Sequence, residues 1–171
     1  EVDLLLQQGA DVRAQDNAAL IGASQEGHVA VVDRLLQVPG MGVNDVRAYN
    51  SLMLIRASAR GHVAVVDRLL QVQGIGIDDV RANNNDALRL ASEHGHDAVV
   101  ERLLQVPGIN AADVRAQNYD GLIVASEYGE VAVVNRLLNV PGINAADVRA
   151  QNNAALRLSL IHISEPTRRS A

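Results

Sequence analysis

The amino-acid sequence predicts an all-α protein in which pairs of short helices stack side by side into a solenoid. Glycine recurs every 34 residues, at Gly27, Gly61, Gly95 and Gly129. Within each period the apolar residues follow helical rather than alternating spacing. Each predicted helix is about ten residues long, too short to be stable alone in water. Neighbouring periods must therefore stack and share one continuous core.

The first helix of each unit is illustrated by the period 84–117. Asn84 and Asn85 are its predicted N-caps, because a short amide side chain can accept a hydrogen bond from a free backbone N–H. Apolar side chains such as Leu88 follow on one face, with polar side chains opposite. Gly95 ends the helix, since glycine adopts the left-handed conformation after a helix most readily.

The second helix of this unit carries its apolar residues between Ala98 and Leu104. Asp97 suits the positive end of the helix dipole at its start. Pro107 and Gly108 stop the helix. We expect the residues that follow, 109–117, to form a loop that returns to the next unit.

The same pattern sets the predicted domain organisation, a single repeat array over residues 1–158. The chain begins with Glu1 instead of Met, inside a partial unit, and we therefore expect it to be a fragment of a longer protein. The array comprises a partial unit 1–15, full units at about 16–49, 50–83, 84–117 and 118–151, and a partial unit 152–158.

Residues 159–171 break the repeat inside a predicted helix, where no domain boundary should lie. Residues 158–169 resemble the in-frame translation of a transposon-based sequencing adapter. We therefore expect 159–171 to be an artefact tail, with a natural C-terminal extension as the alternative.

Composition excludes several classes of protein. The chain has no cysteine, which excludes disulfides, thiol catalysis and Cys-ligated zinc. All 15 basic residues are arginine, which excludes Schiff-base chemistry and a phosphate-loop lysine. A net charge of −5 argues against nucleic-acid binding, and no stretch of apolar residues is long enough to span a membrane. We expect no cofactor and no metal.

Histidine and serine recur in phase, which raises metal binding or catalysis as possibilities. His28, His62 and His96 open the second helix of successive units. Equivalent residues of stacked helices lie about 10 Å apart, too far to share one ion. A nucleophile needs a base that a third group holds in place, and equivalent copies of Ser24 and Ser58 in every unit do not suggest one. We interpret both series as structural and expect the array not to be an enzyme.

The tripeptide Asp-Val-Arg also recurs, beginning at Asp11, Asp45, Asp79, Asp113 and Asp147. We interpret it as a set of ion pairs between adjacent units. The alternative is a ladder of charges for a charged partner.

The repeat resembles the ankyrin family. Residues 5–16 are similar to the family pattern Leu-Leu-x-x-Gly-Ala-Asp-Val-Asn-Ala-x-Asp, and Gly27-His28 with the Val-Val and Leu-Leu pairs that follow is similarly ankyrin-like. The resemblance covers residues 1–158. The sequence at 152–158 resembles that of ankyrin arrays from intracellular bacteria and from microbes living with protists.

Two departures from the family pattern bear on the fold. The Thr-Pro-Leu-His tetrapeptide that opens the first helix in this family is missing, and the loop after the second helix is longer in later units. We therefore expect the helix pairs of an ankyrin-like α-solenoid, with the family's β-hairpin fingers reduced or absent.

The resemblance implies a protein–protein interaction module that binds a protein partner through its concave face. Alternatives are a substrate-recruiting array of a larger enzyme or effector, whose catalytic domain lies outside this sequence, and a structural spacer. Acidic residues predominate at the variable positions, so we expect a partner with a basic patch and a monomeric array; the compartment stays open. The candidate partner-binding residues are Asn17, Gln25, Glu26, Ser51, Leu52, Arg60, Asn85, Asp86, Glu93, His94, Tyr119, Asp120, Glu127 and Tyr128.

Overall fold

The computed structural model describes residues 2–147, apart from the side chains of residues 2, 5 and 117–120. The partial unit 152–158 and the predicted artefact tail lie outside the described residues. The described part of the chain contains helices and no strand, as expected for an all-α solenoid. The helices are α1 (Val2–Gln7), α2 (Ala14–Gln25), α3 (Val29–Leu36), α4 (Val43–Val46), α5 (Ala48–Ala59), α6 (Val63–Leu70), α7 (Ile77–Val80), α8 (Ala82–Glu93), α9 (Asp97–Leu104), α10 (Ala111–Val114), α11 (Ala116–Glu127) and α12 (Val131–Leu138).

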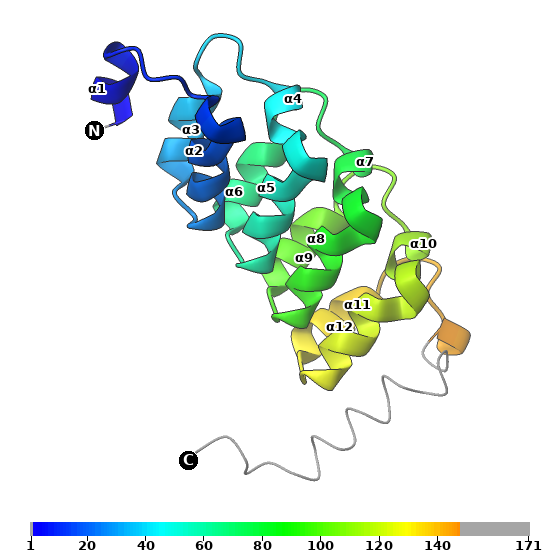
Figure 1. Cartoon of the computed structure of the whole chain (residues 1–171). Helices are drawn as coiled ribbons and strands as arrows, with labels where there is room; N and C mark the ends of the chain where they lie inside the picture. Colours follow the sequence, from blue (N-terminus) through cyan, green and yellow to red (C-terminus); the bar gives the residue numbers. More distant parts are fainter. Residues whose placement is uncertain (1, 148–171) are drawn as a thin grey trace, which may run out of the picture.

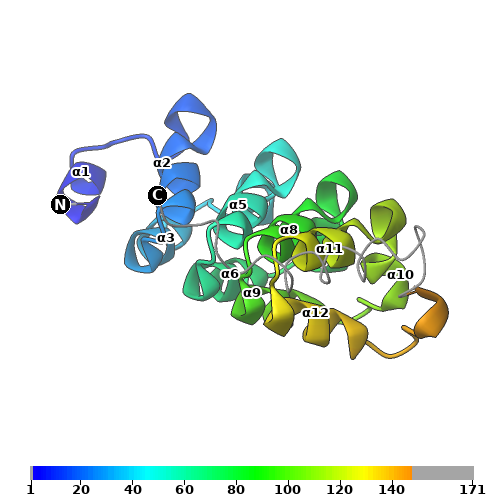
Figure 2. The ribbon, with the colours of Figure 1, turned by 90° about the horizontal axis from the view of Figure 1, so that it is seen from below.

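The longer helices form two parallel rows (Figures 1 and 2). We call α2, α5, α8 and α11 the inner helices; each packs against the next one along the row. We call α3, α6, α9 and α12 the outer helices, and these also pack in sequence order. Each inner helix contacts the outer helix that follows it, which confirms the predicted stack of helix pairs.

The core lies between the two rows and repeats with the sequence. Leu54 of α5 and Leu69 of α6 are 1% and 0% exposed, and the equivalent leucines of the other units are similarly buried. Burying one leucine contributes about 1.5–3 kcal/mol relative to leaving it exposed. Because each apolar face is completed by the neighbouring unit, the stack rather than the single helix is the stable structure.

The loops that follow α3, α6 and α9 each contain a short helix that the repeat pattern does not predict. Residues 109–117 were expected to be a loop, but α10 occupies Ala111–Val114. The reason is the recurring aspartate, because Asp113 accepts a hydrogen bond from the backbone N–H of Asn110 at 2.9 Å and caps the helix. Asp45 and Asp79 cap α4 and α7 in the same way.

A left-handed turn lies near the start of the inner helices α2, α5 and α8, where it separates α4 and α7 from the rest of α5 and α8. Three consecutive residues have positive φ in each described turn, for example Asn83, Asn84 and Asn85 at 50°, 60° and 65°. The prediction that Asn84 and Asn85 are ordinary N-caps is therefore wrong, since an N-cap residue has extended backbone. The left-handed conformation costs about 1–2 kcal/mol per residue for most side chains, and asparagine tolerates it best.

Arginine and aspartate of the Asp-Val-Arg repeat join adjacent units, as interpreted from the sequence. Arg47 contacts Asp79 with an Nε–Oδ1 distance of 2.8 Å, and its guanidinium also donates to the Gly74 carbonyl at 2.7 Å. Burial by itself would raise the pKa of Asp79, but hydrogen bonds from Arg47, the Gly76 N–H and Ser51 outweigh it, so that this pKa is lowered. The equivalent pairs are Arg13–Asp45, Arg81–Asp113 and Arg115–Asp147.

The outer helices carry a second set of inter-unit ion pairs. Arg68 of α6 bonds to Asp33 of α3, and Arg102 of α9 bonds to Asp67 of α6. Here the arginine reaches back to the preceding unit, whereas the Asp-Val-Arg arginines reach forward. Adjacent units are therefore held by ion pairs along two separate lines.

Candidate functional site

The exposed ends and outward sides of the inner helices form one surface, which we call the inner-helix face. It extends along the inner helices from the residues just after the left-handed turns, Leu52 and Asp86, to the residues just before the periodic glycine, where the chain reverses into the outer helix. Tyr128 is 49% exposed there, and Glu26, Arg60, His94 and Glu127 are also exposed. Its predicted partner-binding residues are Gln25, Glu26, Leu52, Arg60, Asp86, Glu93, His94, Glu127 and Tyr128.

Three residues predicted to lie on the partner-binding surface are buried instead. Asn17, Ser51 and Asn85 are 8%, 3% and 9% exposed, so the expectation that they present side chains to a partner is wrong. The cause is the left-handed turn, in which each is the third residue. The Ser51 hydroxyl, for example, donates to Asp79 Oδ1 at 2.9 Å inside the structure. The side chains of Tyr119 and Asp120 lie outside the described residues.

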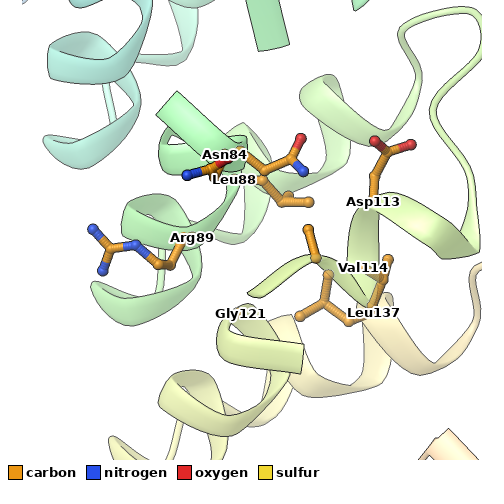
Figure 3. A pocket seen from close by; sticks show the side chains of 9 residues that line it. Asn84, Leu88, Arg89, Asp113, Val114, Gly121 and Leu137 are labelled. Atoms are coloured by element: carbon orange, nitrogen blue, oxygen red, sulfur yellow. The ribbon is translucent and has the colours of Figure 1, made fainter. Parts of the chain in front are cut away.

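Asn85 borders a small cavity between two units (Figure 3). The cavity has a volume of about 10 Å³ and lies between α8, α10, α11 and α12, with Leu88, Asp113 and Leu137 in its lining. The Oδ1 atom of Asn85 has no hydrogen-bond partner in the described part of the chain. A space of this size holds about one water molecule, so the cavity is too small for a substrate or cofactor.

Charges on the inner-helix face are paired within the chain. Arg60 Nη1 lies 3.1 Å from Glu26 Oε1, which joins α2 and α5 across the face. Arg89 bonds to Asp86 at 3.0 Å and to Glu93 at 3.1 Å, because the three residues share one side of α8. These exposed and half-exposed pairs are worth little in stability, and a charged partner could exchange with them at low cost.

Negative charge gathers on the α8 and α11 part of the face. Asp86 and Glu93 share the single guanidinium of Arg89, which leaves an excess of negative charge on α8. Glu127 is exposed at the end of α11 and adds to it. By contrast, Arg56 and Arg60 give the α5 part of the face a positive excess. The face is therefore electrically uneven along the array.

The recurring histidines pack between units, as interpreted from the sequence. His62 Nε2 is 2.9 Å from the carbonyl oxygen of Gln25, the last residue of α2, and His96 Nε2 is 3.1 Å from that of Ala59 in α5. Each ring thus satisfies a carbonyl that the end of the preceding inner helix leaves unpaired. Burial lowers the pKa of His96.

The His94-Gly95-His96 sequence does not form a chelating pair. The two imidazole rings are stacked with their centroids 6.0 Å apart, and His94 Nδ1 is bonded to the carbonyl of Leu90. Among residues 2–147, no three His, Asp or Glu side chains come together as metal ligands.

Three of the recurring serines have structural contacts, whereas the buried Ser58 hydroxyl has no hydrogen-bond partner in the described part of the chain. The hydroxyls of Ser24, Ser92 and Ser126 donate to the backbone carbonyl four residues earlier, at 2.8, 2.7 and 2.8 Å. These bonds keep the hydroxyl proton within the helix and agree with the structural interpretation of these three serines.

No described helix combines the length and apolar character that a membrane crossing requires.

Comparison with known families identifies the repeat. The family model of ankyrin repeats, in three copies, matches residues 54–152, which is more than half of the chain. A comparison with curated proteins gave no match.

Proposed function

The chain belongs to the ankyrin repeat family, and on that premise we propose that it binds a protein partner through its inner-helix face, on the concave side of the array. Ankyrin repeats are in general protein–protein interaction modules. The finer assignment to this face rests on the exposure, variation and charge of its residues.

The observation that carries the proposal is the contrast between a repeated interior and a varied face. Leucine fills the same buried position in every inner helix, for example Leu54 and Leu88. The two residues before the glycine instead change from unit to unit, from Ala59-Arg60 to Glu93-His94 and Glu127-Tyr128. A rigid scaffold that presents a varied surface can bind with little ordering cost.

The α8–α11 part of the face offers the best anchor. Tyr128 is a half-exposed aromatic side chain, and tyrosine is enriched among the residues that dominate binding energy. Glu127 precedes it in the chain, and Glu93 holds the equivalent position one unit earlier, so that this part of the face is acidic. We therefore place a partner's basic patch at this end of the face, where the acidic residues Asp86, Glu93 and Glu127 outnumber Arg89.

The proposal assigns binding and no chemistry to the array. His62, His96, Ser24 and Ser92 are engaged in bonds to backbone carbonyls that hold the helices together. The Ser58 hydroxyl is buried and has no hydrogen-bond partner in the described part of the chain, so no described base contacts it either. A nucleophile in such a bond has no base directed at it.

Selection of binders from a library tests the proposal even though the natural partner is unidentified. A phage-displayed domain library is selected against the whole chain, and each binder is then measured on two variants. Glu127→Gln with Tyr128→Ala alters the inner-helix face, and Ala132→Arg changes the net charge by the same amount on the exposed side of α12.

We expect binders to lose about tenfold or more in affinity on the double variant and to keep their affinity on the control. We also expect the binding to weaken as the salt concentration rises, since salt screens exposed charges. Binders that are insensitive to the double variant would contradict the assignment of the face, and salt-insensitive binding would contradict the basic patch.

A further inference from the structure

The left-handed turns present a second surface, which we call the tip row. It consists of the exposed turn residues Gln15, Tyr49, Asn50, Asn83 and Asn84. The turns project in sequence order along one edge of the array (Figure 2). They lie near the start of the inner helices, whereas Arg60 and Tyr128 follow the last helical residue, so that about 13 Å of helix separates the tip row from the end of the inner-helix face.

The tip row is rich in amide groups, which can donate and accept hydrogen bonds at once. Asn50 Nδ2 donates to Asn83 Oδ1 of the next unit at 3.0 Å. This bond orients the Asn83 amide and leaves its Nδ2 donors unengaged by other described residues. An outward pair of donors is thus fixed at the junction of two units.

The tip row also holds an exposed aromatic ring in place. Tyr49 is 56% exposed, although a ring of this size is usually more covered. The nearby carboxylate of Asp16 in α2 raises the pKa of Tyr49 by interacting with its hydroxyl. Because more than half of the side chain is exposed, the ring offers an apolar face to a ligand.

We propose that the tip row binds a proline-rich peptide in the polyproline II conformation. Such a helix has three residues per turn and rises about 3.1 Å per residue, so equivalent carbonyls recur about every 9 Å. Stacked helical units repeat at about 8–10 Å, which brings successive turns into register with successive carbonyls.

The chemistry of the two surfaces is also complementary. A polyproline II helix has no internal hydrogen bonds, so its carbonyl oxygens are open to amide donors such as those of Asn83. Proline rings stack on aromatic side chains, and the exposed ring of Tyr49 offers such a contact. An extended β-strand fits less well, because its side chains and carbonyls repeat about every 6.7 Å, out of step with the units.

Glycine variants test the proposal without strain, because glycine accepts positive φ at no steric cost. Tyr49→Gly and Asn83→Gly, combined, remove the ring and the amide donors from positions with φ of 53° and 50°. Tyr128→Ala is the matched control, since it removes a similarly exposed tyrosine from the other surface. Urea unfolding of each variant checks that the array stays folded.

Fluorescence anisotropy then measures binding of labelled dodecaproline and of a glycine–serine peptide of the same length. We expect saturable binding of dodecaproline alone, weakened about tenfold by the double glycine variant and unchanged by Tyr128→Ala. Equal binding of both peptides, no binding of dodecaproline to the intact array, or no effect of the double variant would overturn the proposal. Binders of the inner-helix face are expected to keep their affinity for the double glycine variant. Either proposal can therefore be contradicted without the other.

Discussion

His96 lies so close over Gly61 of the preceding unit that a Cβ atom on this glycine would stand 2.6 Å from the imidazole Nδ1. His62 covers Gly27 with the same geometry. The periodic glycine thus has two roles: it takes φ of 75° to reverse the chain, and it leaves room for the next unit's ring. The glycine and histidine of the repeat therefore act as a pair across the unit boundary.

Two glycine-to-alanine variants separate these roles. Gly129→Ala adds only the backbone cost of a positive φ, about 1–2 kcal/mol, because no described atom lies within 4 Å of the added Cβ. Gly61→Ala adds the same cost and also displaces the His96 ring, for about 1–3 kcal/mol more. Urea unfolding measures both. Equal losses of unfolding free energy in the two variants would show that the His96 ring does not exclude a Cβ atom at Gly61. Combining Gly61→Ala with His96→Ala is expected to recover part of the extra loss of Gly61→Ala.

Glu130 occupies the position of this histidine in the last described outer helix. Its carboxylate lies over Gly95, but an ionised carboxylate cannot donate to the carbonyl of Glu93 as an imidazole would. We expect Glu130→His to raise the free energy of unfolding at neutral pH by about 1 kcal/mol, the value of one hydrogen bond. The reverse exchange, His96→Glu, is expected to lower it. A drop in the urea midpoint of Glu130→His would contradict this account.

Acid is expected to destabilise the array through the Asp-Val-Arg aspartates. Hydrogen bonds from arginine and the backbone lower the pKa values of Asp45, Asp79 and Asp113 in the folded state. Their stabilisation is fully present above the unfolded pKa of about 3.9 and is lost as the pH falls through the lower folded values. Urea unfolding at a series of pH values should show a steep loss below about pH 4. We expect Asp79→Asn to be less stable than the native chain at neutral pH and to lose less in acid.

His96 adds a milder pH dependence of its own. Burial lowers its pKa in the folded state, so the unfolded chain takes up its proton first as the pH falls. The free energy of unfolding should therefore begin to decrease below the unfolded pKa of about 6.5, before the aspartates titrate. His96→Gln should remove this early decrease in the free energy of unfolding. If the variant and the native chain lose the same free energy between about pH 6.5 and 5, the decrease does not come from His96.

The left-handed turns predict an unusual response to glycine. Gln15 is exposed and has φ of 51°, so its side chain adds strain and no described contact. Gln15→Gly should raise the free energy of unfolding by about 0.5–1 kcal/mol, the relieved strain less the entropy cost of glycine. Gln15→Val should lower it, because a β-branched residue tolerates positive φ least. Thermal unfolding of the two variants gives opposite shifts if this is correct.

The period and the apolar spacing were enough to predict the stacked helix pairs, because one buried leucine such as Leu88 recurs at the same place in every unit. The Arg47–Asp79 ion pair also followed from its recurrence. The short helices did not, since Asp113 caps α10 from inside a segment whose composition is typical of a loop. Propensity in a four-residue helix is too weak a signal when a single cap decides its formation.

The candidate face was predicted only in part. Glu127 and Tyr128 lie at the end of a helix that the glycine marks, so their exposure could be predicted. Ser51 and Asn85 could not be placed, because their burial depends on three consecutive left-handed residues. Asparagine tolerates the left-handed conformation as a single residue, but the sequence does not predict three such residues in succession.

Amide hydrogen exchange tests the central claim, that the inner-helix face is the binding surface, most directly. The exchange of the free chain is compared with that of the chain saturated with a selected binder. The account predicts added protection at the ends of α8 and α11, around Glu93 and Tyr128, with the outer helices unchanged. Protection confined to α9 and α12 would contradict it.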